Sequence, residues 1–125
     1  MFEKLGLTRM AQTLAAHAGS RVEVVARNIA NADTPGFRAQ DIPAFESIYD
    51  DANFTLRKTR RGHLVSDGLL STSQANGSGM APNGNDVSLD QQMMKAIEAR
   101  QSHEMALAVY RSTAAIIRTS LGRYN

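Results

Sequence analysis

Four carboxylates lie close together in the sequence and are the first candidates for chemistry. They are Asp41, Glu46, Asp50 and Asp51. Two carboxylates held at a fixed separation on rigid elements can cleave a glycosidic bond. The stretch around them shows little periodicity and is interrupted by Pro43, so it predicts no rigid element that would fix such a pair. We therefore predict no catalytic residue and a protein that is not an enzyme.

The histidines and the glycine-rich pieces do not form the pattern of a metal or cofactor site. His17, His63 and His103 are far apart, without the close spacing that zinc ligands show in a sequence. Cysteine is absent, which excludes thiolate metal sites, thiol catalysis and disulfides. The pieces Asn76–Gly79 and Asn83–Asn85 lack the lysine and the spacing of a phosphate-binding loop. We predict no metal, no cofactor and no small-molecule substrate.

One basic run, Arg57 to Arg61, leaves a small nucleic-acid-binding protein as an alternative. The net charge of the chain is only +2, from 14 basic and 12 acidic residues. No aromatic residue that could stack on a base interleaves with the run. These features favour a solvated face, or a contact with an acidic neighbour in an assembly, and we predict no nucleic-acid partner.

The N-terminal segment, residues 1–32, predicts a long helix. Its small and apolar residues recur every three or four positions, which places them on one side of a helix. These residues are Leu7, Ala11, Leu14, Ala18, Val22, Val25, Ile29 and Ala32. Two consecutive steps of four, from Leu14 to Val22, interrupt the heptad phase and locally unwind a left-handed supercoil.

The C-terminal segment, residues 86–125, predicts a second long helix with a heptad stripe. The stripe consists of Leu89, Met93, Ala96, Arg100, His103, Leu107, Tyr110, Ala114, Ile117 and Leu121. Ser88 and Gln91 have the spacing of a capping box, and Asp86 and Asp90 favour the positive end of the helix dipole. The polar interruption at Arg100 and His103 could fix the register of this helix.

The residues between the two helices have a different character. Residues 33–70 predict a turn and an extended segment, with a strand pair over residues 54–65 that turns at Gly62. Residues 71–85 are rich in Ser, Gly and Asn and predict a flexible loop. The fold class is therefore mainly α, with one domain over residues 1–125. Its long terminal helices form a coiled-coil-like hairpin, and its middle is irregular or short-β.

A hairpin of this size buries little surface and is marginal alone, so its stripes are also expected to contact other subunits. The candidate residues of this assembly face are Leu14, Val25, Ile29, Leu89, Met93, Leu107, Tyr110, Ile117 and Leu121. Residues 1–20 contain charged residues and lack the unbroken apolar run of a secretory signal peptide. We therefore expect no cleavable signal.

A sharp stop follows the first helix, in the run from Asn28 to Phe37. Thr34 precedes a proline and is therefore pushed toward an extended conformation. Pro35 and Gly36 suit the two central positions of a type II turn, where glycine supplies the positive φ. The turn residues singled out in this run are Asn28, Asn31, Thr34, Pro35, Gly36 and Phe37.

This run closely resembles the signature near the N-terminus of bacterial flagellar rod and hook proteins. There a helix ends in Asn-(Leu/Ile)-Ala-Asn, and Thr-Pro-Gly-(Tyr/Phe) follows two residues later. Three further pieces resemble the same family: Arg38–Phe45, Thr59–Leu64 and Asn83–Leu89. The chain also lacks the central domain of the longer members, as the short subunits of the proximal rod do, and the resemblance leaves more than one of these open.

The resemblance implies a structural subunit of the proximal rod in the flagellar basal body. It implies that the subunit is exported by the flagellar type III apparatus and assembles in the periplasm. Its partners would be copies of itself and other rod subunits of the FliE, FlgC and FlgF types. It would link the base formed by FliE and the membrane-embedded MS ring to the rod, and would transmit torque.

Overall fold

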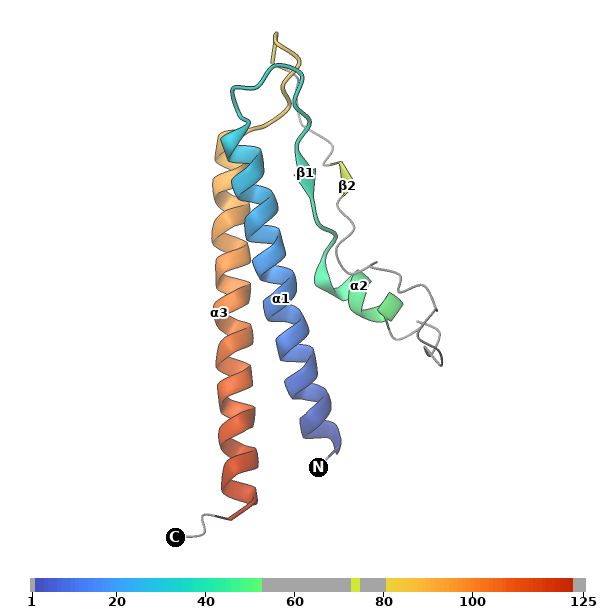
Figure 1. Cartoon of the computed structure of the whole chain (residues 1–125), viewed down its shortest axis with the longest axis vertical. Coiled ribbons are helices and arrows are strands. Elements are labelled where there is room, and N and C mark those ends of the chain that lie inside the picture. The colour runs from blue at the N-terminus through green and yellow to red at the C-terminus, as the bar shows by residue number, and fades with distance from the viewer. Residues whose placement is uncertain (1, 53–72, 75–80, 123–125) are drawn as a thin grey trace, which may run out of the picture.

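Two long antiparallel helices dominate the computed structural model, which describes residues 2–52, 73–74 and 81–122 (Figure 1). Helix α1 spans Phe2–Ala30, and helix α3 spans Leu89–Ser120. Between them lie strand β1 (Gln40–Asp41), helix α2 (Phe45–Ala52) and strand β2 (Ser73–Gln74). The predicted mainly α fold, with terminal helices that pack against each other, is confirmed.

Small side chains form the contact between α1 and α3. The buried residues of α1 include Ala11, Ala18 and Val25, and those of α3 are Gln92, Ala99, Ala106 and Thr113. In both sets the members are seven residues apart, which is the repeat of a left-handed coiled coil. Alanine at these positions lets the two backbones approach closely, because the distance between packed helices depends on the side chains at the contact.

The buried line differs from the stripes that the sequence predicts. On α1, Ala11, Ala18 and Val25 are buried as expected, but Leu7, Val22 and Ile29 are exposed. On α3 the difference is larger, because the buried line runs through Gln92, Ala99, Ala106 and Thr113, all of which lie outside the predicted stripe. Four apolar residues of that stripe are exposed instead: Leu89, Met93, Tyr110 and Leu121. The buried line is rich in alanine, and the large apolar side chains of the predicted stripe lie beside it.

The segment after α1 folds back along the hairpin as an arm, residues 38–52 (Figure 1). Ile42 and Ile48 of the arm form a buried apolar cluster with Val24 of α1. β1 pairs antiparallel with β2, with Gln40 opposite Gln74 and Asp41 opposite Ser73.

Helix α2 was not expected, since the sequence predicts a turn and an extended segment over residues 33–70. Pro43 ends the extended piece, and the apolar pair Phe45 and Ile48 then recurs at a helical spacing. The helix is short, so its few periodic residues gave a weak signal. The strand pair predicted over residues 54–65 lies outside the described residues.

The ends of the long helices also refine the prediction. α1 ends at Ala30, two residues before the predicted end, and turns occupy residues 31–33. Ser88 is the N-cap of α3, but its side chain makes no capping hydrogen bond, so the serine half of the predicted capping box is absent.

The predicted turn after α1 is confirmed. The Phe37 N–H donates to the Thr34 carbonyl at 3.3 Å, and Gly36 has a φ of 72°. A hydrogen bond across four residues, with positive φ at the third, is the pattern of a type II turn.

Replacing Gly36 with valine should destabilise the protein through the backbone alone. An added Cβ at Gly36 would meet nothing within 4 Å, so no clash contributes. Positive φ for a β-branched residue costs on the order of 1–2 kcal/mol or more. Urea unfolding of Gly36→Val should show this loss, and flagellated cells carrying it should lose motility. Gly19→Val is a control with negative φ; if both variants unfold alike, backbone strain at Gly36 is not the cause.

Candidate functional site

The two sequence pieces at the ends of the long helices meet at the tip of the hairpin. The Gly36 N–H donates to the Asn83 carbonyl at 3.0 Å, and the Asp86 N–H donates to the Phe37 carbonyl at 3.3 Å. Gly84 has a φ of 79°, and a Cβ built on it would lie 3.6 Å from the Gly36 Cα. The segment before α3 therefore docks backbone to backbone on the turn that follows α1.

Asn85 is the residue that closes the end of α1. Its side-chain amide donates to the carbonyls of Asn31, Ala32 and Thr34 at 2.9, 2.8 and 2.8 Å. Its Oδ1 accepts from the Val87 N–H at 2.8 Å. These carbonyls belong to the turn that follows α1, and a side chain from across the hairpin supplies them with a donor. The loop predicted over residues 71–85 thus includes a residue that is only 3% exposed.

Asp86 binds the start of the arm and does not act as an N-terminal residue of α3. Its Oδ1 accepts from the Ala39 N–H at 2.6 Å, and its Oδ2 lies 3.8 Å from the Arg38 guanidinium. The carboxylate is buried. The sequence predicts that Asp86 begins the helix; instead it precedes the N-cap, and its charge is used by the arm.

Asn28 joins three parts of the molecule. Its Nδ2 donates to the Gln40 carbonyl at 2.7 Å, and its Oδ1 accepts from the Gln40 N–H at 3.0 Å. The same Nδ2 donates to the Gln92 Oε1 at 3.0 Å. Asn28 and Gln92 are both almost completely buried. The amide of Asn28 thus pairs with a strand backbone as a neighbouring strand would, while it also holds α3.

A cluster of charges fixes the arm further along the hairpin. Lys95 of α3 lies 2.7 Å from Asp41 Oδ2, and Arg21 of α1 lies 3.4 Å from Asp41 Oδ1. Arg21 also lies 3.8 Å from Glu98. Burial raises the pKa of Asp41, but the Lys95 hydrogen bond, the Ile42 N–H and the two positive charges outweigh it. The pKa of Asp41 is therefore below its ordinary value.

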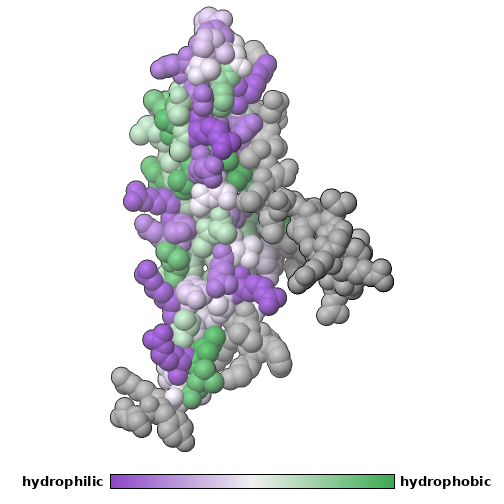
Figure 2. Space-filling model, in the orientation of Figure 1, coloured by the Kyte–Doolittle hydropathy of each residue, from purple (hydrophilic) through white to green (hydrophobic). Residues whose placement is uncertain are grey.

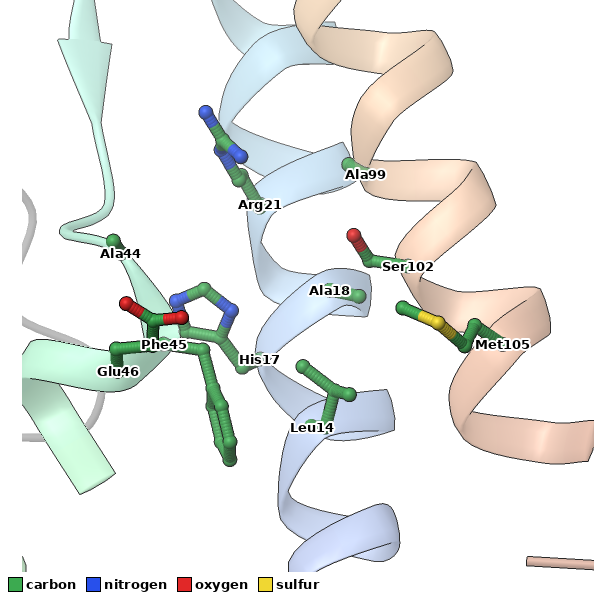
Figure 3. Close-up of a pocket in the computed structure, with 10 residues that line it drawn as sticks. All are labelled: Leu14, His17, Ala18, Arg21, Ala44, Phe45, Glu46, Ala99, Ser102 and Met105. Atoms are coloured by element: carbon green, nitrogen blue, oxygen red, sulfur yellow. The ribbon is translucent and has the colours of Figure 1, made fainter. Parts of the chain in front are cut away.

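A groove of about 420 Å³ lies beside this cluster, between α1, α3 and the start of α2 (Figure 3). His17 points from α1 toward the arm, and its Nε2 donates to the Pro43 carbonyl at 2.8 Å. Its ring also meets the edge of Phe45, with centroids 5.7 Å apart. Leu14 and Met105 line the groove from the two long helices. His17 is thus a packing histidine that holds the arm.

The arm occupies one side of the hairpin and leaves the other side open. Arg21 and Asn28, which contact the arm, follow the buried Ala18 and Val25 by three residues. Val22 and Ile29 follow the same residues by four. On an α-helix, residues three and four positions after a given residue lie on opposite sides of it. Val22 and Ile29 therefore face away from the arm.

The same geometry holds on α3, where Lys95 marks the side of the arm. Leu89 precedes Gln92 by three residues, Met93 follows it by one, and Tyr110 follows Ala106 by four, which places them on the opposite side. We name as the open face the exposed residues Val22, Ile29, Leu89, Met93 and Tyr110, which are 36–55% exposed. Figure 2 shows apolar side chains at the surface of the hairpin, separated by polar ones.

The predicted assembly-face residues divide into three groups. Ile29, Leu89, Met93 and Tyr110 belong to the open face. Val25 is buried between the helices and Leu14 lines the groove beside the arm, so neither belongs to the open face. Leu107 and Ile117 are half-buried and Leu121 is exposed.

The other residues considered for chemistry are not brought together in the described part of the chain. Asp41 is held by Lys95 and Arg21, and Glu46 is exposed on α2. The side chains of Asp50 and Asp51 lie outside the described residues, as do His63 and the basic run Arg57 to Arg61. His103 is half-buried on α3. Among the described residues, no group of three or more His, Asp and Glu is placed to hold a metal ion.

Comparison with known proteins decides the family. The family model of the flagella basal body rod protein matches residues 9–38. The flagellar basal body rod protein FlgB of Agrobacterium fabrum is 31% identical over 119 residues, which cover 88% of each chain. The chain belongs to the FlgB family of flagellar basal body rod proteins. FlgB of Aeromonas hydrophila is 46% identical over 48 residues, 36% of each chain.

The FlgB family is one of structural rod proteins, and membership gives this chain a structural role in the basal body of the flagellum. Among the short rod subunits that the sequence resembles, these relatives identify the FlgB type rather than the FlgC type. No helix in the described residues is both long enough and apolar enough to span a bilayer. The matched family region, residues 9–38, contains Arg21, Asn28 and the whole turn.

Sequence reasoning identified the turn but missed the residues that hold it. Asn85 and Asp86 stand in a piece that resembles the family, but the sequence placed Asn85 in a loop and Asp86 at the start of the helix. Gln92 and Lys95 fell outside the predicted stripe of α3. A cluster of Asn and Asp directly before an N-cap is a signal for such roles, because these side chains readily bind backbone groups.

Asn85→Asp should destabilise the protein strongly although the two side chains have the same shape. The change replaces the donating amide with an oxygen that faces three carbonyls and leaves them without this donor. The new oxygen is buried at position 85 against carbonyl oxygens, without a donor there. An unsatisfied buried polar group costs about 1–3 kcal/mol, so we expect a loss of about 2 kcal/mol in urea unfolding.

Asn83→Asp is the matched control for this prediction. The Asn83 Oδ1 only accepts, from the Asn85 N–H at 3.1 Å, and a carboxylate retains that bond. It should therefore change stability little. Equal losses for the two variants would refute the capping role of Asn85.

Proposed function

We propose that this FlgB-family chain builds the proximal rod by packing the open face of its hairpin against neighbouring subunits. The observation that carries the proposal is the open face itself, a row of large apolar side chains on both helices that are 36–55% exposed in the single subunit. Large exposed apolar patches on a folded protein mark interaction sites. Here the patch lies on a hairpin that is already packed through other residues.

The close packing of the hairpin suits a subunit that transmits torque. The helices meet through small residues at a heptad spacing, and their tip is closed by the hydrogen bonds of Asn85. A joint of this kind resists bending, because close-packed elements do not deform continuously. The open face then remains available for contacts between subunits.

Within the basal body, we propose that the neighbours are copies of this chain and rod subunits of the FliE, FlgC and FlgF types. The subunit would link the base formed by FliE and the MS ring to the rod. It would reach the periplasm through the flagellar export apparatus. A helical face offered by every copy suits a repeating assembly, in which each copy meets equivalent neighbours.

Met93→Asp tests the open face. Met93 is 55% exposed in the free subunit, so an aspartate there should leave the hairpin folded. In an assembled rod the same charge would be buried without a partner, at a cost of several kcal/mol. We expect the variant to be secreted at the normal level but to be absent from purified basal bodies, leaving the cells non-motile.

Gln101→Asp is the matched control, since it places the same charge on an exposed position of α3 away from the open face. Secreted fraction, recovery in basal bodies and helical content are measured for both variants. Assembly of Met93→Asp at the level of the control would mean that the open face is not an assembly surface.

A further inference from the structure

The arm is held on the hairpin mainly by polar contacts. Its apolar contribution is one small cluster, in which Ile42 and Ile48 meet Val24. The groove of about 420 Å³ separates the start of α2 from the long helices, so packing there is incomplete. The contacts that span the gap are the charge cluster at Asp41 and the hydrogen bond of His17.

Asp41 is the one carboxylate that joins the arm to both long helices in the described structure. It pairs with Lys95 on α3 and with Arg21 on α1, at 2.7 and 3.4 Å. All three side chains are 20–25% exposed, so the pairs are partly shielded from solvent and salt. Partly buried ion pairs contribute more than exposed ones, and removing one partner leaves the others uncompensated.

The groups around Asp41 leave its two positive partners poorly balanced once its charge is lost. Asp41 faces Arg21 on α1 and Lys95 on α3. The other charged or titratable side chains here contact different groups: His17 binds the Pro43 carbonyl, and Glu98 lies 3.8 Å from Arg21. Ser73 of β2, directly opposite Asp41, carries no charge. Glu46 of α2 lines the same groove as His17 and Arg21.

We propose that Asp41, Arg21 and Lys95 form an acid-released latch that fixes the arm across the hairpin at neutral pH. When Asp41 is neutralised, Lys95 and Arg21 lose the carboxylate that they share, and the arm from Ile42 onward separates from the hairpin. Asn28 still holds Gln40, and α1 and α3 stay paired. The hairpin survives because its contact, through Ala18 and Ala99, does not include the arm.

The pH range follows from the direction of the shift. The pKa of Asp41 lies below its ordinary value of 3.8, so the carboxylate is charged in the folded protein throughout the neutral range. A group with a lowered folded pKa contributes stability above its unfolded pKa and loses it as the pH falls through the folded one. The latch is therefore closed near pH 7 and opens below about pH 3.8.

The experiment measures the distance between the arm and α3 in the full chain. The chain has no cysteine, so Ser47→Cys on α2 and Gln101→Cys on α3 carry the only two spin labels. At pH 7 the wild type should give one narrow distance distribution. Asp41→Asn, which keeps the shape of the side chain and the bond from the Ile42 N–H, should give a broad one at the same pH. Amide exchange within residues 42–48 should then be at least about tenfold faster.

Asp90→Asn is the matched control, because Asp90 is exposed in the first turn of α3. It should behave as wild type. The variants are compared at one pH and leave Asp86 and its bond from the Ala39 N–H unchanged.

Two outcomes would overturn the latch. In the first, Asp41→Asn keeps the narrow distribution at pH 7, which means that the charge does not hold the arm. In the second, helical content falls together with the arm contact, which means that Asp41 supports the whole hairpin. Loss of the arm contact with unchanged helical content supports the proposal.

Discussion

The side-chain amide of Asn28 is the interaction on which the rest of this structure depends. It sits on α1, binds both backbone groups of Gln40 in β1, and donates to Gln92 on α3. A buried amide is costly unless its hydrogen-bonding groups are paired, and only one arrangement of these three segments pairs them. The register of the helices and the position of the arm are therefore set at a single point.

At the tip of the hairpin, side chains likewise supply partners to backbone groups. Turns and helix ends expose carbonyl and N–H groups that must find partners. Asn85 supplies a donor to three carbonyls after α1, and Asp86 supplies an acceptor to the Ala39 N–H where the arm begins. Both residues come from the segment before α3, so closing the tip also joins the two halves of the chain.

The long helices divide two tasks between different faces. Small residues bring the helices together within one subunit, and the larger apolar residues, such as Met93 and Ile29, stay exposed on the open face. In a protein that works alone such exposure would be a liability. In the proposed rod assembly, these residues would supply apolar contacts between subunits, while close packing and hydrogen bonds keep each subunit in shape.

The sequence by itself determined the two long helices, the turn at Pro35 and Gly36, and the family. These features are local, since helical periodicity, a proline and a glycine with positive φ act within a few residues. Helix α2 was missed because eight residues hold too few repeats of the helical period to stand out.

Only the tertiary structure decided which helical line is buried and what the polar residues do. Several sets of residues on α3 recur every three or four positions. Which set is buried, here the one with Ala99 and Ala106, depends on the side chains of α1 that it contacts. Likewise Asn85, Asp86 and Lys95 look like loop or surface residues along the chain. Their partners, at Asn31, Ala39 and Asp41, lie about fifty residues away in sequence, where no local pattern can record the contact.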